Sequence, residues 1–130
     1  MTDGVSLVLW TLAAFQLKHF LGDFVLQTKT QVVNKGFYGR RGGIAHAATH
    51  ALLSVPVLVL LTRAPVLIAA AAAAEFLVHY HIDWAKARTD RVMGWSDRDS
   101  IYWAAFGIDQ LLHQLTYLAI VAVLLPQAAG

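Results

Sequence analysis

The sequence predicts an all-α protein that crosses a membrane as a bundle of four helices. Charged residues make up only 14% of its 130 residues and hydrophobic residues 58%, whereas soluble domains are about 25% charged. Four apolar segments approach the length of about 20 residues that a membrane-spanning helix needs. Ionisable residues inside these segments recur every three or four positions, which is the spacing of one face of a helix.

The four predicted spans follow one another along a chain long enough for one domain, residues 1–130. They cover residues 5–27, 44–61, 65–84 and 101–125. The first carries charged residues near its end, and the second has no Lys, Arg, Asp or Glu. The third begins at Pro65, since proline is favoured in the first turn of a helix. The fourth is expected to end at Pro126, because proline lacks the N–H that continues the hydrogen-bond ladder.

Basic residues between the spans predict the orientation of the bundle. Eight Lys and Arg residues lie in the first and third joins, residues 28–43 and 85–100, and the second join has only Arg63. Since positively charged loops stay in the cytoplasm, we expect both joins there and both termini on the opposite, non-cytoplasmic side. The same loops would also attract anionic lipid headgroups.

Each span places ionisable residues on one of its faces. The set contains five of the six histidines and four carboxylates, namely His19, Asp23, His46, His50, Glu75, His79, Asp83, Asp109 and His113. Counted from the predicted cytoplasmic ends at about 1.5 Å per residue, they lie roughly 5 to 20 Å deep on all four helices. Ionisable groups at membrane depth face a bundle interior or one another. We therefore expect one polar cluster in the cytoplasmic half of the bundle.

Imidazole and carboxylate groups on facing helices form the metal sites of helical bundles. The chain has no cysteine, so the ligands must be nitrogen and oxygen, which suits one or two divalent transition-metal ions such as Zn, Fe or Mn. The expected ligands are His19, Asp23, His46, His50, His79, Asp83, Asp109 and His113. Glu75 lies deepest on its stripe and is the expected base that takes a proton from metal-bound water. Gln27, Thr49 and Gln110 are expected to hydrogen-bond the ligands.

Two other interpretations of the cluster stay open. Its residues would also satisfy one another as buried hydrogen bonds and ion pairs that hold helices together in lipid. A chain of intramembrane His, Asp and Glu is equally typical of a proton relay or a path for divalent cations. Against transport, the polar groups crowd into one half of each span, and most of the other half is apolar.

Five basic residues are candidates for binding an anionic substrate. They are Lys18, Arg40, Arg41, Lys86 and Arg88. Lys18 lies about 100° from His19 around the helix, so an ion pair with Asp109 or Glu75 is favoured over contact with a substrate for this residue. His81 lies about 200° from His79 around its helix and is left out of the cluster.

Four motifs extend over nearly the whole chain. They are His19-Phe-Leu-Gly-Asp23-Phe-Val-Leu-Gln27, the pair His46 and His50, His79-Tyr-His-Ile-Asp83-Trp-Ala-Lys86, and Asp109-Gln110-Leu-Leu-His113. Together they resemble the bacterial membrane-protein family labelled domain of unknown function 3307. The resemblance implies a small integral protein of the bacterial cytoplasmic membrane. It implies no particular activity. A looser similarity to membrane-bound metal-dependent hydrolases is an analogy.

These observations favour a metal-dependent hydrolase that acts on a lipid or lipid-linked substrate at the cytoplasmic half of the bilayer. Oxidative di-iron chemistry uses the same ligand types. The alternatives are a proton or divalent-cation transporter and a non-catalytic, metal-stabilised scaffold. Membrane lipid is the expected partner, and a homo-oligomer is compatible with so small a bundle. Nucleic acid is not expected, because the net charge is only +2.

Overall fold

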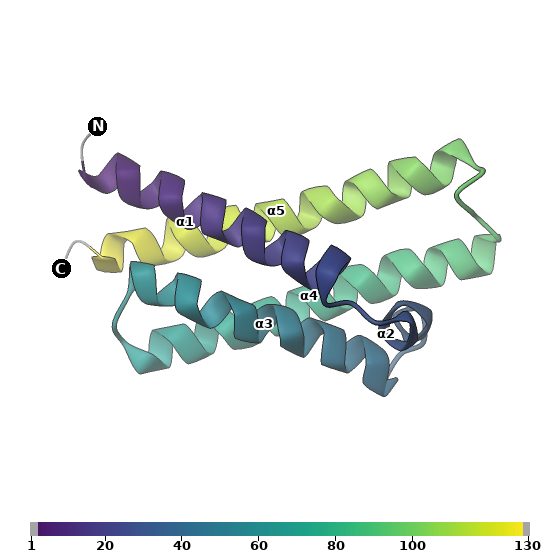
Figure 1. The fold of residues 1–130 in the computed structure, drawn as a ribbon, viewed down its shortest axis with the longest axis horizontal. Helices are drawn as coiled ribbons and strands as arrows, with labels where there is room; N and C mark the ends of the chain where they lie inside the picture. Colours follow the sequence, from purple (N-terminus) through teal and green to yellow (C-terminus); the bar gives the residue numbers. More distant parts are fainter. Residues whose placement is uncertain (1–2, 129–130) are drawn as a thin grey trace.

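The computed structural model describes residues 3–128 and is all-α over this range (Figure 1). Its α-helices are α1 (Asp3–Phe20), α2 (Lys29–Asn34), α3 (Arg41–Leu61), α4 (Pro65–Met93) and α5 (Ser100–Ala128). A π-helical turn, η1 (Leu21–Val25), continues α1. Four segments are long and apolar enough to cross a membrane: Gly4–Val25, Arg41–Leu61, Pro65–Met93 and Ser100–Pro126. The all-α class and the four helices that the sequence predicts are therefore confirmed.

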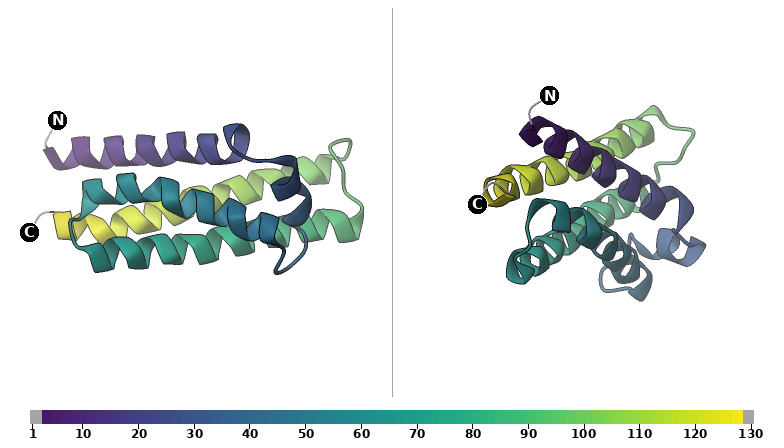
Figure 2. Two further views of the ribbon diagram at one scale, coloured as in Figure 1. Left: turned by 60° about the horizontal axis from the view of Figure 1, so that its bottom comes forward. Right: turned by 60° about the vertical axis from the view of Figure 1, so that its left-hand side comes forward.

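The four long helices form one bundle, in which α3 contacts α1, α4 and α5. Figures 1 and 2 show both ends of the described chain and the turn between α3 and α4 at one end of the bundle. The segment around α2 and the turn between α4 and α5 lie at the other end, which we call the loop end (residues 26–40 and 94–99). This is the up-and-down order that four successive spans predict. Which end faces the cytoplasm stays a prediction.

α4 is nine residues longer than predicted, and residues 85–93, expected in a charged join, continue the helix. Lys86 Nζ forms an ion pair with Asp90 Oδ2 at 2.8 Å, one helical turn away. Gly94 ends the helix in the left-handed conformation, with φ of 70°, which glycine adopts without steric cost. The 29 residues of α4 extend about 43 Å, which is more than a hydrocarbon core of roughly 30 Å requires.

A short helix, α2, lies in the polar join after the first span, where none was predicted. Thr28 begins it with a capping box. Its Oγ1 accepts a hydrogen bond from Gln31 N at 3.3 Å, and its own N–H donates to Gln31 Oε1 at 2.9 Å. The spacing of Thr28 and Gln31, three residues apart, is typical of a capping box and could have predicted the start of this helix. The helix ends at the cap residue Lys35, and α3 then begins at Arg41, three residues before the predicted span.

The first span is not a uniform α-helix, because it changes into a π-helical turn at Leu21. Leu26 N donates to Leu21 O at 2.8 Å, five residues back instead of four. The helical segment therefore ends at Val25, two residues before the predicted end at residue 27. Such turns are frequent at functional sites, and this one contains Asp23.

The half of the bundle nearer the termini has an apolar core. It is formed by Phe15, Val57, Leu58, Leu61, Tyr117, Val121 and Leu124. Large hydrophobic side chains also cover the outside, as contact with lipid would require, and Val66 is 77% exposed. α5 continues past Pro126, its predicted end, to Ala128. A proline in the last turn removes one backbone donor, but the two residues after it still take helical backbone angles.

Candidate metal centre

All four long helical segments contribute to one buried cluster of imidazole and carboxylate groups. Its rings are those of His19, His46, His50, His79 and His113, none of which is more than 4% exposed. The ring centroids of His50 and His79 lie 3.9 Å apart, and those of His79 and His113 lie 4.2 Å apart. The stripes on separate helices therefore meet in space.

Asp23, in η1, lies among three histidines. His50 Nε2 donates to its Oδ1 at 3.0 Å, and His46 Nε2 lies 3.1 Å from the same oxygen. His19 Nε2 lies 3.2 Å from Oδ2. Gly22 permits the close approach of α3, since a β-carbon there would collide with the His50 ring. The π-helical turn and its glycine thus bring this carboxylate against α3.

Asp83, in α4, is surrounded in a similar way. Its Oδ1 accepts a hydrogen bond from His113 Nε2 at 3.2 Å. Its Oδ2 lies 3.2 Å from His46 Nε2, 3.3 Å from His79 Nε2 and 3.0 Å from Lys35 Nζ. The His46 ring therefore stands between the two aspartates of the cluster.

Several of these close contacts lack the direction of a hydrogen bond. His46 Nε2, both ring nitrogens of His79 and Asp83 Oδ2 are buried and have no hydrogen-bond partner. Ligands held about 2.0–2.1 Å from a tetrahedral zinc ion lie about 3.3 Å from one another. The N···O separations in the cluster are 3.0, 3.1, 3.2 and 3.3 Å. Separations of this size occur around a bound ion and also in ordinary hydrogen bonds and ion pairs, so it is the missing hydrogen-bond partners that point to an ion.

Two overlapping sets of residues offer ligand atoms within 4.8 Å of one another. They are Asp23, His46, His50 and His79, and His79, Asp83 and His113. The first set has the three imidazoles and one carboxylate of a four-coordinate ion, and the second leaves a position for water or substrate. The two sets share His79, so they could hold one ion, or two ions that divide the ligands between them.

Six of the eight predicted ligands fall in these sets, and His19 and Asp109 do not. His19 Nδ1 is hydrogen-bonded to Tyr117 OH at 2.8 Å, and its Nε2 to Gln110 Oε1 at 3.0 Å. Asp109 Oδ1 lies 3.8 Å from His113 Nε2 and has no hydrogen-bond partner. Both residues therefore border the ligand sets without completing either one.

Glu75, the predicted base, forms a buried ion pair with Lys18. Lys18 Nζ also donates to the backbone carbonyl of His50 at 3.4 Å and lies 4.4 Å from the centroid of the Tyr117 ring. Glu75 Oε2 is buried without a hydrogen-bond partner. Glu75 lines an apolar groove between α4 and α5. The structure thus directs Lys18 into the protein and not toward a substrate at the loop end.

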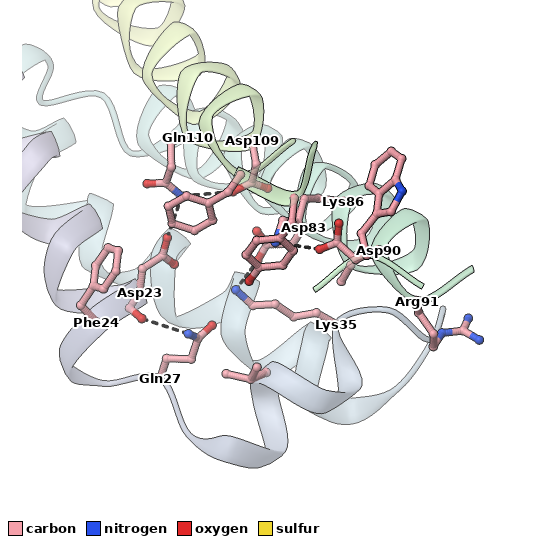
Figure 3. A pocket seen from close by; sticks show the side chains of 15 residues that line it. Asp23, Phe24, Gln27, Lys35, Asp83, Lys86, Asp90, Arg91, Asp109 and Gln110 are labelled. Atoms are coloured by element: carbon pink, nitrogen blue, oxygen red, sulfur yellow. Dashed lines mark hydrogen bonds and ion pairs between the residues drawn. The ribbon is translucent and has the colours of Figure 1, made fainter. Parts of the chain in front are cut away.

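A cavity of about 420 Å³ joins the loop end to the cluster (Figure 3). Its lining includes the carboxylates of Asp23, Asp83, Asp90 and Asp109, the cations Lys35, Lys86 and Arg91, and the rings of Trp95, Tyr102 and Phe106. Figure 3 shows Lys35 pointing toward Asp83. Convergent polar groups beside aromatic walls are typical of a ligand site. Neither Lys18 nor Glu75 lines this cavity.

Of the predicted substrate-binding residues at the loop end, Lys86 lines the cavity, and Arg40, Arg41 and Arg88 do not. Lys86 Nζ lies 4.1 Å from the centroid of the Tyr102 ring. The three arginines are exposed, and their position suits contact with anionic headgroups at a membrane surface.

The residues predicted to support the ligands differ in their contacts. Gln27 Nε2 donates to the backbone carbonyl of Asp23 at 2.9 Å, and Gln110 Nε2 donates to Asp23 Oδ2 at 3.4 Å. Thr49 Oγ1 donates instead to the Ala45 carbonyl of its own helix at 3.0 Å. A threonine hydroxyl inside a helix readily reaches the carbonyl four residues earlier, so Thr49 is turned away from the role predicted for it.

Several residues of the site were absent from the sequence prediction, among them Tyr117, Lys35, Arg91 and the aromatic residues Trp95, Tyr102 and Phe106. Tyr117 contacts His19, and Lys35 and Arg91 line the cavity. Tyr117 follows Asp109 and His113 at steps of four, which was a usable signal. Lys35 and Arg91 had no such signal, because they belong to joins where every basic residue fits a lipid-facing role.

The chain is similar to one protein family over most of its length. The family is described as "Protein of unknown function (DUF3307)", and the match covers residues 11–129. No curated protein and no solved structure matches the chain. The matched range includes every residue of both ligand sets.

Proposed function

The chain belongs to the DUF3307 family of proteins of unknown function, and from its site we propose that it is a membrane-embedded, metal-dependent hydrolase. Its substrate is a lipid or a lipid-linked phosphate that enters at the loop end. It holds one or two divalent ions of Zn, Fe or Mn. The protein resides in the bacterial cytoplasmic membrane with the loop end facing the cytoplasm, surrounding lipid is its partner, and a homo-oligomer is compatible with this arrangement.

The observation that carries this proposal is the pair of aspartates at the inner end of the cavity. Asp23 and Asp83 line the cavity, and each belongs to a ligand set. A molecule in the cavity would therefore meet an ion that they hold. His46 and His79 have buried ring nitrogens without hydrogen-bond partners. Burying such a group without a partner costs folding free energy, which favours a bound ion over a purely structural network.

Asp109 is better placed than Glu75 to act as the base. A divalent ion held by the ligand sets would lower the pKa of water bound to it to near neutral, and a base beside it would take the proton. Asp109 lines the cavity and has a free Oδ1, whereas Lys18 holds Glu75 outside the cavity. We therefore assign the role of proton acceptor to Asp109.

The wall of the cavity supports a substrate that combines an anionic group with an apolar part. Lys35, Lys86 and Arg91 provide positive charge, and the rings of Tyr102 and Phe106 provide apolar surface. Lysine and arginine are common ligands of phosphate oxygens. A phosphate-bearing lipid has both features.

Transport is the alternative function, and one feature supports it. The Lys18–Glu75 ion pair extends the polar cluster toward the apolar half of the bundle. Beyond it, however, Leu58, Leu61 and Val121 pack into the apolar core. An ion or proton would have to cross this core, so the packing favours a site with one entrance over a continuous path.

Metal analysis of purified protein tests the proposal. Protein extracted in detergent without chelator is examined by plasma mass spectrometry beside the double variant His50→Ala, His79→Ala. His81→Ala is the matched control, because His81 is exposed and hydrogen-bonds Tyr38 outside the ligand sets.

We expect one or two equivalents of a transition metal in the wild type and in His81→Ala, and none in the double variant. The loaded protein is then tested for phosphate release from phosphatidic acid in mixed micelles. Metal-free wild-type protein that takes up no ion on titration would overturn the proposal. A metal content that is lost in the double variant without any hydrolysis would leave the non-catalytic scaffold.

A further inference from the structure

Lys35 lies beside Asp83 in a position where it competes with a metal ion. Its Nζ is 3.0 Å from Asp83 Oδ2. The same oxygen is 3.2 Å from His46 Nε2 and 3.3 Å from His79 Nε2, and Asp83 belongs to a ligand set. A divalent ion at this position and the Lys35 ammonium would therefore share one carboxylate.

Lys35 also has space to leave Asp83. It lines the cavity, and its side chain is 14% exposed (Figure 3). The other cations of the cavity lining are held by groups outside the ligand sets. Lys86 pairs with Asp90 at 2.8 Å, and Arg91 donates to the Gly36 carbonyl at 3.1 Å. Among the lining residues that the structure describes, Lys35 is thus the cation that is paired with a carboxylate of a ligand set, Asp83.

Metal binding would reverse the sign of the charge in the cavity. Its lining has four aspartates, residues 23, 83, 90 and 109, against three cations. With neutral histidines, this gives a net charge of −1. One divalent ion changes the net charge to +1, so the cavity attracts cations before metal binding and anions after it.

We propose that a divalent ion at Asp83 displaces Lys35, and that the freed ammonium and the ion together bind a phosphate group in the cavity. The inference rests on the metal site of the proposed function, to which it adds a substrate-binding residue and an order of binding. An ammonium is a compact donor that suits phosphate oxygens. The phosphate belongs to a lipid headgroup or to a soluble compound, and the recognised chemistry is the same.

Thermodynamic linkage makes this order measurable. If metal binding raises the affinity for phosphate, phosphate must raise the affinity for metal by the same factor. Removal of Lys35 has opposite effects on the two ligands. The metal loses a competitor and binds more tightly, whereas phosphate loses a charged hydrogen bond and binds about tenfold more weakly.

The experiment compares the wild type with Lys35→Met, Lys35→Arg and the control Lys29→Met, whose lysine is exposed on the same short helix and does not line the cavity. Zinc affinity is measured by chelator competition in detergent. Inorganic phosphate binding is measured by calorimetry on metal-free protein and on zinc-loaded protein from which free zinc has been removed. Lipid nanodiscs of phosphatidylcholine, with and without phosphatidic acid, then compete for the phosphate site.

We expect phosphate to bind zinc-loaded protein and not metal-free protein. Among the zinc-loaded proteins, Lys29→Met should match the wild type, Lys35→Met should bind about tenfold more weakly, and Lys35→Arg should recover most of the affinity. Displacement of phosphate by phosphatidic acid would identify a lipid source, and its absence a soluble one; both support the phosphate site. Equal phosphate binding in Lys35→Met and the wild type would overturn this inference alone. Wild-type protein that binds no zinc would overturn the proposed function as well.

Discussion

Gly22 lies against the imidazole ring of His50 with no space for a β-carbon between them. The glycine belongs to the π-helical turn that also contains Asp23, and His50 Nε2 donates to Asp23 Oδ1 at 3.0 Å. The contact between η1 and α3 therefore fixes one carboxylate and one imidazole of the first ligand set relative to each other.

Gly22→Ala should displace His50 and impair metal binding. Adding atoms to a tightly packed interior costs about 1–3 kcal/mol, and here the ring that must move belongs to the first ligand set. We expect a lower unfolding free energy and a metal content well below that of the wild type. Gly107→Ala is the control, because a β-carbon there has no neighbour within 4 Å. Full metal content in Gly22→Ala would contradict the assignment of His50 as a ligand.

His19→Ala and His79→Ala should differ in degree. His79 belongs to both ligand sets, so its removal should abolish metal binding. His19 lies outside both and links Tyr117 to Gln110 through its two ring nitrogens. Loss of such a supporting residue typically weakens metal binding about 10–100-fold. Competition with a coloured chelator measures both affinities, and an equal loss in the two variants would show that His19 is itself a ligand.

Lys18→Met should destabilise the bundle, because it leaves Glu75 buried and unpaired. Lys18 is 4% and Glu75 1% exposed, and breaking a buried ion pair costs about 3–5 kcal/mol. The double variant Lys18→Met, Glu75→Gln should recover most of this loss. Unfolding by SDS in mixed micelles gives the free energies for the cycle. Equal stability of the single and double variants would indicate that the two charges do not depend on each other.

Asp109→Asn should abolish hydrolysis while metal stays bound, and Glu75→Gln should retain hydrolysis. A general base contributes about 10²–10⁴-fold to the rate. Asp109 lines the cavity, has an oxygen without a hydrogen-bond partner and lies 3.8 Å from His113 of the second ligand set. Phosphate release from phosphatidic acid is measured at equal metal content. The reverse pattern, with activity lost only in Glu75→Gln, would return the role of base to Glu75.

The sequence alone predicted the four long helices and the face of each that carries ionisable groups. Hydropathy and helical periodicity are local properties, so residues within one span suffice to reveal them. The steps of four that join His46 to His50 and Asp109 to His113 are examples. The ends of the helices were harder to predict from the sequence. α4 continues to Met93, and its end was missed because residues 85–93 are mostly polar and hydropathy does not mark a polar helix.

Only the tertiary structure decided which groups meet. Lys18 and Glu75 are 57 residues apart in sequence, and their ion pair depends on how α1 and α4 are rotated toward each other. The packing of α5 likewise leaves Asp109 on the cavity wall. Periodicity places residues on a face but does not say how far around the bundle axis that face is turned, so the exchange of Glu75 for Asp109 as the proposed base required the structure.

The sequence therefore determined that histidines and aspartates gather inside a four-helix bundle, and the structure decided which of them converge in the two ligand sets. Lys35 shows the difference most clearly. In the sequence it is one of eight basic residues in the joins, whereas in the fold its ammonium lies 3.0 Å from Asp83. Lys35 is the C-terminal cap residue of α2, and its contact with Asp83 of α4 arises from packing between distant segments, which no local pattern encodes.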